Sequence, residues 1–145
     1  MPRRIKQQEH GWALDAAETP DYQALKDWDG QGPLQLDCDA EPDEQVVNAE
    51  CIGIGFPAFT DGRALSLAVL LRTRFGYAGE IAALGATHED ITHYLVRCGF
   101  DAIEIAPGRK PELYLALAAP YSGYYQDSVM TPGSSFGRAS GDAKA

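Results

Sequence analysis

The sequence predicts an α/β fold: a parallel sheet of about four strands with alternating helices, arranged as a half-barrel or as an open three-layer sheet. Three observations predict it. Short apolar runs typical of buried strands alternate along the chain with segments whose apolar residues recur at helical spacing. The connections between them are short, and a helix between two strands is the usual link between parallel neighbours. The length of 145 residues, 45% of them hydrophobic, is sufficient for one domain with its own core.

The chain begins with a polar segment, residues 1–32, in which scattered aromatics follow no sustained period. We expect an N-terminal arm or short ribbon here, with the GWALD stretch at 11–15 as one short strand. Residues 33–39 alternate apolar and polar side chains, as a half-buried or edge strand does. They open the α/β domain, which we place at 33–125. Pro42 and the acidic residues after it then predict one or two helical turns.

The clearest core strand is predicted at 51–56, where the run CIGIGF is apolar, contains β-branched residues and is bounded by Pro57. An amphipathic helix follows at about 63–75 and ends at Gly76, since glycine readily takes the left-handed conformation after a helix. The apolar side chains that recur at helical spacing are Ala64, Ala68, Leu71 and Phe75. Together these segments predict one strand–helix unit.

The same alternation continues to the end of the domain. A second buried strand is predicted at 79–86 and a helix at 88–98, followed by a strand at 101–106 and a helix at 110–118. Because a helix separates each pair of these strands, we expect them to run parallel with right-handed crossovers. The stretch at 126–145 is rich in Ser, Gly and Ala, and we expect a disordered tail there.

In parallel α/β folds, ligands bind beyond the carboxyl ends of the strands. The three loops predicted at those ends are 57–63, 85–89 and 106–110. We expect these loops to share one rim. The polar side chains that they would bring there are Thr60, Asp61, Arg63, His88, Glu89, Arg109 and Lys110.

Asp61 has two interpretations. It can be the N-cap of the helix that follows, because aspartate is among the residues preferred there. It can also belong to a site, since it stands with Gly62 and Arg63 at the predicted rim. Arg63 in the first helical turn opposes the helix dipole, so it needs a partner: Asp61, Glu89 or an anionic ligand. The sequence leaves both interpretations open.

Other polar residues suggest less chemistry. His88 and His93 are five residues apart and do not share a helix face, so we predict no metal site and treat His88 as a loop or first-turn residue. Glu104 lies in an otherwise apolar strand, where its carboxylate has to face solvent, a partner chain or a basic group. Arg97 is our candidate for that basic group. We find no local signature of Ser–His–Asp or Cys–His catalysis and no phosphate-binding loop.

Charge and cysteine content exclude several classes of function. The formal net charge of −9 argues against nucleic acid as a partner, since phosphate binding needs clustered Lys and Arg. We find no secretory signal and no apolar run of about 18 residues, and expect a cytoplasmic protein without a membrane span. Cys38, Cys51 and Cys98 lie far apart, which fits reduced thiols and excludes an iron–sulfur cluster held by this chain alone. The exposed edges of a short sheet favour a homodimer.

Two stretches carry a resemblance to a known family. Residues 56–85, FPAFTDGRALSLAVLLRTRFGYAGEIAALG, and residues 95–105, LVRCGFDAIEI, resemble the bacterial domain-of-unknown-function 934 family, and the resemblance extends over residues 33–125. The positions that match the family pattern in the first stretch are Phe56, Phe59, Asp61, Gly62, Arg63, Ser66, Ala68, Leu71, Arg72, Arg74, Gly76, Tyr77, Gly79, Glu80, Ala83 and Gly85. Those in the second stretch are Leu95, Arg97, Cys98, Gly99, Phe100, Asp101 and Ala102.

Members of that family are labelled probable oxidoreductases involved in sulfite reduction, because their genes tend to neighbour assimilatory sulfite reductase. The resemblance therefore implies an accessory or adaptor protein of sulfur assimilation that is not catalytic by itself, carries no cofactor and binds sulfite reductase or a related redox protein. The alternative is a small oxidoreductase or electron carrier with a bound flavin-type cofactor. No catalytic residue comes with the family.

The chain departs from the family pattern at two places. Ala64 and Leu65 stand where relatives have Gly-Tyr, and the segment ATHEDIT at 86–92 lacks the arginine and glutamine that relatives tend to carry there. The resemblance thus implies a diverged member. Our candidate residues for binding a ligand or partner are Asp61, Gly62, Arg63, His88, Glu89 and Arg97, and we assign no catalytic residue and no metal ligand.

Overall fold

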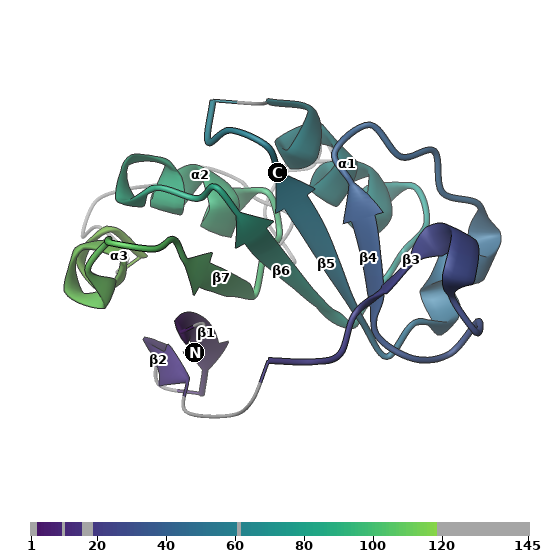
Figure 1. The fold of residues 1–145 in the computed structure, drawn as a ribbon, viewed down its shortest axis with the longest axis horizontal. Helices are drawn as coiled ribbons and strands as arrows, with labels where there is room; N and C mark the ends of the chain where they lie inside the picture. Colours follow the sequence, from purple (N-terminus) through teal and green to yellow (C-terminus); the bar gives the residue numbers. More distant parts are fainter. Residues whose placement is uncertain (1–2, 10, 16–18, 61, 119–145) are drawn as a thin grey trace, which may run out of the picture.

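The structure is a computed structural model that describes residues 3–9, 11–15, 19–60 and 62–118. Within these residues the chain forms a mixed α/β fold with one seven-stranded sheet, whose strands lie in the order β2-β1-β7-β6-β5-β4-β3 (Figure 1). The strands are β1 Arg3–Gln8, β2 Gly11–Asp15, β3 Gln23–Ala24, β4 Leu34–Asp37, β5 Cys51–Phe56, β6 Glu80–Gly85 and β7 Ala102–Ile105. Asp61 and the predicted tail at 126–145 lie outside the described residues.

The strands from β3 to β7 are neighbours in chain order and run parallel to one another. The sequence correctly predicts four of them, and the apolar segments at 51–56, 80–84 and 102–106 lie side by side as expected. A sheet of about four strands, all parallel, is nevertheless wrong. β1 pairs antiparallel with β7, and β2 pairs antiparallel with β1. β1 and β2 follow one another in the chain and form a hairpin, and an antiparallel pair of this kind needs no crossover helix.

Ion pairs hold the N-terminal hairpin on the sheet. The Arg4 side chain is buried, with Nε 2.7 Å from Asp15 Oδ2 and Nη1 3.0 Å from Glu80 Oε2. Lys6 Nζ lies 3.0 Å from the other oxygen of Glu80. The hairpin therefore reaches past β7 to the beginning of β6. The N-terminal segment has no sustained apolar period, and its ion pairs with Glu80, far away in the sequence, help to hold it on the sheet.

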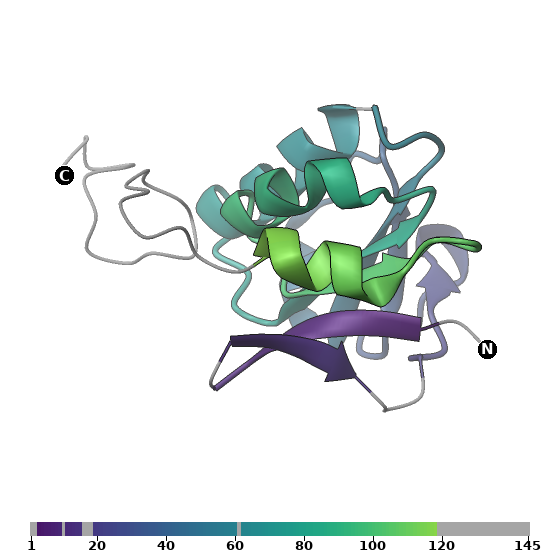
Figure 2. The ribbon, with the colours of Figure 1, turned by 90° about the vertical axis from the view of Figure 1, so that its left-hand side faces the viewer.

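Three α-helices of the described part of the chain lie on one face of the sheet (Figures 1 and 2). They are α1 Gly62–Thr73, α2 Thr92–Arg97 and α3 Pro111–Ala118, and the 3-10 turns are η1 Leu25–Asp27, η2 Glu44–Asn48 and η3 Glu89–Ile91. Right-handed crossovers between strands that are neighbours in chain order place every helix on the same side. Over residues 3–9, 11–15, 19–60 and 62–118 the fold therefore has two layers and not the three of an open doubly covered sheet.

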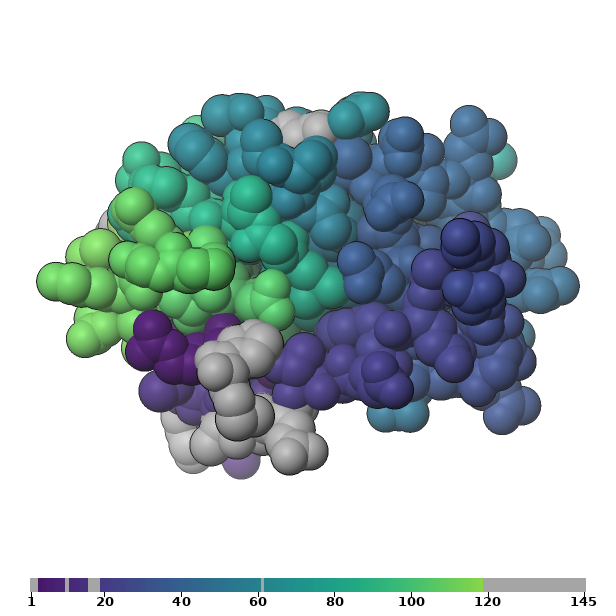
Figure 3. Space-filling view, viewed as in Figure 1, coloured from purple at the N-terminus to yellow at the C-terminus, as the bar shows by residue number. Residues whose placement is uncertain are grey.

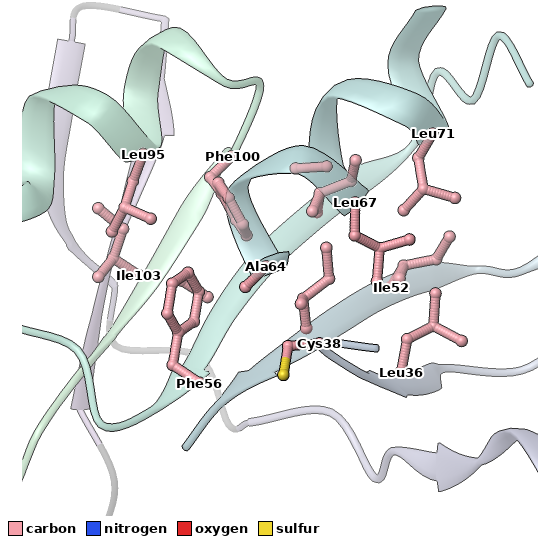
Figure 4. Close-up of a cluster of buried hydrophobic side chains, with 14 of the residues drawn as sticks. Leu36, Cys38, Ile52, Phe56, Ala64, Leu67, Leu71, Leu95, Phe100 and Ile103 are labelled. Atoms are coloured by element: carbon pink, nitrogen blue, oxygen red, sulfur yellow. The ribbon is translucent and has the colours of Figure 1, made fainter. Parts of the chain in front are cut away.

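The main core fills the space between the sheet and these helices. Alternate strand residues, among them Ile52 and Phe56 of β5, meet the α1 side chains Leu67 and Leu71, and all four are buried (Figure 4). Phe56 also contacts Phe100, with ring centroids 5.9 Å apart. Each buried aliphatic or aromatic side chain of this kind contributes roughly 1.5–3 kcal/mol to folding. The strand side chains that face the helices thus form the hydrophobic core.

The predicted helices shift at their ends for local reasons. α1 ends at Thr73 rather than at Phe75, because the amide of Phe75 turns back to the carbonyl of Leu70 and Gly76 takes a φ of 66°. The helix expected at 88–98 begins as the 3-10 turn η3 and becomes α2 only at Thr92. Both differences are of the size expected at helix ends.

The second face of the sheet carries no helix among the described residues. Gly53, Ala82 and Ala102 occupy strand positions on this face, and Tyr22 packs against Ala82 and Ala102 there. Figure 1 shows the segment that leads into β3 passing in front of this face, and Figure 3 shows the same face with side chains in place. We call it the open face. It has room for a ligand or partner where Tyr22 does not cover it.

Candidate functional site

The loops after β5, β6 and β7 meet at one edge of the sheet, because the three strands run parallel. They are residues 57–60, 86–88 and 106–110. This edge is the rim that the sequence predicts. We call it the strand-end rim.

An aromatic contact joins the first two loops. The rings of Phe59 and His88 stack with centroids 4.6 Å apart and an interplanar angle of 28°. Phe59 remains 39% exposed. His88 is the N-cap of η3, and its Nδ1 accepts a hydrogen bond from the amide of Asp90 at 3.0 Å. The imidazole is therefore held through one face by an aromatic ring and through its edge by a backbone amide.

An ion pair joins η3, which directly follows the second loop, to the third loop. Arg109 binds both carboxylate oxygens of Glu89: its Nε donates to Oε1 at 2.9 Å, and its Nη2 donates to Oε2. The Glu89 carboxylate is largely buried, and the hydrogen bonds from Arg109 hold its pKa below the usual range. Glu89 is thus bound by Arg109, whereas the sequence analysis named it as one possible partner of Arg63. Bidentate pairs of this kind fix geometry as well as charge.

His88, Glu89 and Asp90 bring potential metal-ligand atoms within 4.8 Å of one another. The existing hydrogen bonds do not fit a metal ion. Both oxygens of Glu89 face the Arg109 guanidinium, and the His88 Nδ1 lone pair is used by the backbone. A metal ion would have to displace these contacts. We assign none to this group.

A hollow of about 630 Å³ lies on the open face, beside the rim. Volumes of this order are typical of ligand sites. The residues that line it are Tyr22, Gln35, Asp37, Cys38, Asp39, Gly55, Phe56, Pro57, Arg63, Leu84, Gly85 and Glu104. They come from four neighbouring strands, the loops that follow them, the first turn of α1 and the segment before β3.

The floor of the hollow follows from strand register. Asp37 of β4 is opposite Gly55 of β5, and Gly55 is opposite Leu84 of β6. Ala83 pairs with Ile103, so Glu104 of β7 comes next in this row. Gly55 lacks a side chain, and Glu104 Oε1 accepts a hydrogen bond from the amide of Gly85 at 3.1 Å. The row thus has a carboxylate at each end and a low apolar centre.

The remaining predicted residues are distributed around these features. Arg63 is exposed in the first turn of α1, lines the hollow and has an interaction partner of its own. Gly62 is exposed at the start of the same helix. Thr60 and Lys110 are exposed on the rim loops. The structure therefore brings Arg63 and the rim residues together at one end of the sheet.

Arg97 lies elsewhere. It ends α2 on the helix-covered face, whereas Glu104 belongs to the strand positions that point to the open face. The structure thus gives the Glu104 carboxylate the amide of Gly85 in place of the predicted Arg97. Arg97 has an interaction partner, although its buried Nε lacks a hydrogen bond.

Sequence reasoning did not select Asp37, Asp39 or Tyr22, which line the hollow. The alternation at 33–39 contains a usable signal for Asp37, because its apolar partners Leu34 and Leu36 face the core and the polar positions face away. Tyr22 has no such signal. It comes from a segment without periodicity and reaches the hollow only through the path of the folded chain.

Cys51 and Cys98 are in environments that keep their thiols protonated. Burial raises the pKa of Cys51 to about 11, and it also raises the pKa of Cys98. Cys38 is buried in the wall of the hollow and has an interaction partner. A nucleophilic cysteine needs the opposite environment, one that lowers its pKa. Cys51 and Cys98 are therefore suited to packing.

Comparisons with known proteins identify a family but no function. The family model described as "Bacterial protein of unknown function (DUF934)" matches residues 34–136. No curated protein and no solved structure matches the chain. None of the described helices has the length and apolar character that crossing a membrane requires.

Proposed function

The chain belongs to the DUF934 family, and from that premise we propose that it is a cytoplasmic accessory protein of assimilatory sulfite reduction. We propose that it docks through its strand-end rim onto sulfite reductase or a related redox protein. It is not catalytic by itself in this proposal. The observation that carries this proposal is the stacked pair of Phe59 and His88. Exposed aromatic side chains held in one orientation are typical anchors of protein interfaces.

The rim is prepared for docking because its loops are already ordered. Phe59 is fixed against His88, and the adjacent Glu89 is fixed by Arg109. A surface that is rigid before binding loses little conformational entropy when a partner arrives. The net charge of −9 adds long-range attraction to a basic partner surface. We choose sulfite reductase as the partner because members of the family that the sequence resembles are labelled as involved in sulfite reduction.

The same contacts favour binding over catalysis. A general acid or base has to exchange a proton with a substrate, and it therefore needs a free lone pair or proton. Nδ1 of His88 accepts from the Asp90 amide, its Nε2 lies 3.7 Å from Glu89 Oε2, and both carboxylate oxygens of Glu89 accept from Arg109. These side chains are better suited to shaping a surface.

A capture experiment tests the docking proposal. Full-length protein is immobilised and exposed to the soluble extract of its own host at low and moderate salt, and bound sulfite reductase is measured by its activity and by mass spectrometry. We expect capture by the parent and at least about tenfold less by Phe59→Ala, a typical loss for an interface anchor. Leu25→Ala is the matched control, because Leu25 is also a large exposed apolar residue, 41% exposed, but lies at the far β3 edge. No capture by the parent, or equal capture by Phe59→Ala, contradicts the proposal.

The alternative function is a small oxidoreductase or electron carrier with a flavin-type cofactor. The volume of the hollow favours it, but the lining does not fit a flavin nucleotide. Asp37, Asp39 and Glu104 stand around the hollow against Arg63, so a phosphate would meet more like charge than opposite charge. Absorbance of the purified protein in the flavin band, retained after gel filtration, would establish the alternative. Absorbance limited to the aromatic band, with no flavin uptake, would exclude it.

A further inference from the structure

We propose that the hollow on the open face binds the side chain of a lysine or arginine supplied by the docking partner. The proposal rests on the proposed function and names the chemistry of the partner surface. The hollow shares Pro57 with the rim and begins where the loop after β5 leaves the sheet. A protein segment seated on Phe59 therefore has a direct path into it.

The lining matches the two parts of such a side chain. Leu84 offers apolar surface for an aliphatic stem on this face, and Gly55 beside it carries no side chain that would fill the space. Asp37 and Glu104 stand on either side, three strand spacings or about 14 Å apart along the row. A long side chain with a cationic head can bury its stem and keep its head near carboxylates. This combination is that of lysine and arginine.

The carboxylates have capacity for a further donor. The hydrogen bond from Gly85 uses Oε1 of Glu104, and among the described residues Oε2 accepts no hydrogen bond. The nearest cation along the strand row, Arg4, is opposite Glu104 in register but is held by Asp15 and Glu80. An ammonium or guanidinium from outside therefore does not have to displace an existing ion pair. The lining carries the carboxylates of Asp37, Asp39 and Glu104 against the single cation Arg63, and this balance favours a cation over an anion.

Direct binding is tested with a minimal probe. Isotopically labelled full-length protein is titrated with butylammonium and, separately, with 1-butanol, a neutral molecule of similar shape. We expect the amide resonances of Gly55 and Gly85 to shift with butylammonium only, and more salt to weaken the effect. Equal shifts with 1-butanol, or none with butylammonium, overturn the proposal.

A paired variant locates the charge. Asp37→Asn with Glu104→Gln keeps side-chain size, and glutamine still accepts the hydrogen bond from Gly85. We expect at least about tenfold weaker binding of butylammonium, the scale of a lost charge-assisted hydrogen bond. Asp27→Asn with Glu112→Gln is the control, since it removes the same charge at exposed positions outside the hollow. Parent-like binding by the first pair overturns the proposal.

A second measurement distinguishes a partner side chain from a free amine. In the capture experiment, the Asp37→Asn and Glu104→Gln pair should retain at least about tenfold less partner than the control pair. If the double variant binds no butylammonium and still captures the partner fully, the hollow binds free amines. That result would overturn the proposal that a side chain of the partner occupies it. Capture by neither parent nor variants contradicts the docking function itself, and the butylammonium titration still decides the chemistry of the hollow.

Discussion

Arg72 and Asp101 form a buried ion pair between the end of α1 and the start of β7. Arg72 Nη2 lies 3.0 Å from Oδ1 and 3.1 Å from Oδ2 of Asp101. The same guanidinium donates to the carbonyl oxygens of Gly99, Tyr77 and Gly79, at distances from 2.7 to 3.1 Å. One side chain therefore closes the backbone turns that lead into β6 and β7. The positions of the rim loops depend on these two strands.

Replacing Arg72 should destabilise the protein strongly. In Arg72→Leu the Asp101 carboxylate loses its partner in a site where its side chain is 18% exposed, and we expect a loss of about 3–5 kcal/mol in the free energy of unfolding. Arg72→Lys keeps the charge but not the planar fork, so its loss should be smaller. Urea denaturation of both variants measures this. A change within about 1 kcal/mol for Arg72→Leu would contradict a structural role.

The pH dependence of Arg72→Leu provides a second check. Burial already raises the pKa of Asp101 above 3.8, and Arg72 opposes that rise. Without Arg72 the folded-state pKa should rise further, so the folded state holds a proton that the unfolded state releases. Stability is then greatest at low pH and falls as pH rises through the folded pKa. The deficit of the variant should accordingly be larger at about pH 7 than at about pH 4, and an equal deficit would count against this explanation.

Gly85 is required by its backbone. It has a φ of 87°, and a Cβ there would lie 2.9 Å from the carbonyl oxygen of Phe56. We expect Gly85→Ala to lose about 1–3 kcal/mol, because both conformation and contact are unfavourable. Gly62→Ala is the control: Gly62 is the first residue of α1, a Cβ there meets no atom within 4 Å, and the change should be neutral or slightly stabilising. Thermal unfolding compares the two, and equal effects would refute the steric explanation.

The thiol of Cys51 should react slowly in the native protein. Its pKa of about 11 leaves roughly one thiolate in a thousand at pH 8, against about one in ten for a thiol at 9.0. Iodoacetamide labelling at about pH 8, followed by peptide mass spectrometry, should therefore modify Cys51 at least about a hundredfold more slowly than in the denatured chain. Labelling of native and denatured protein at the same rate would show that the thiol is accessible and ionised.

Alkaline pH should unfold the protein through buried phenol and thiol groups. Burial raises the pKa of Tyr77 from 10.0 to about 12, and its hydroxyl donates to the carbonyl of Ala49 at 2.9 Å. Because the unfolded chain releases these protons first, stability is complete below about pH 9 and is lost as pH rises toward 11–12. Urea midpoints measured across this range should fall. In Tyr77→Phe the midpoint should start lower and fall less steeply, and parallel curves would contradict the assignment.

The strand–helix alternation could be predicted because each element carries its own local pattern. The apolar run at 51–56 and the helical spacing of Ala64, Ala68 and Leu71 identify β5 and α1 without knowledge of any neighbour. Glycines at 76 and 99 mark the helix ends, and both take positive φ in the structure. From these patterns the parallel order of β5, β6 and β7 follows, and with it the meeting of their loops at one rim.

The partners at the rim could not be predicted in the same way. Arg63 and Arg109 are both cations close to Glu89 in the predicted topology, and only the folded loops show that Arg109 binds it. The hollow likewise depends on where Tyr22 crosses the open face and on the register that places Asp37 beside Gly55. Neither follows from spacing along the chain.

The sequence by itself determined the central β5–α1–β6–α2–β7 unit, its rim loops and the family, because these depend on residues within one or two turns of each other and on a recognisable pattern of motifs. Only the tertiary structure decided that the N-terminal hairpin joins β7, that the helices cover one face, and that a hollow with carboxylates lies on the other. The physical reason is that periodicity and turn preference act between near neighbours in the chain. Ion pairs such as Arg4 with Glu80 act between residues that only the complete fold brings within about 3 Å.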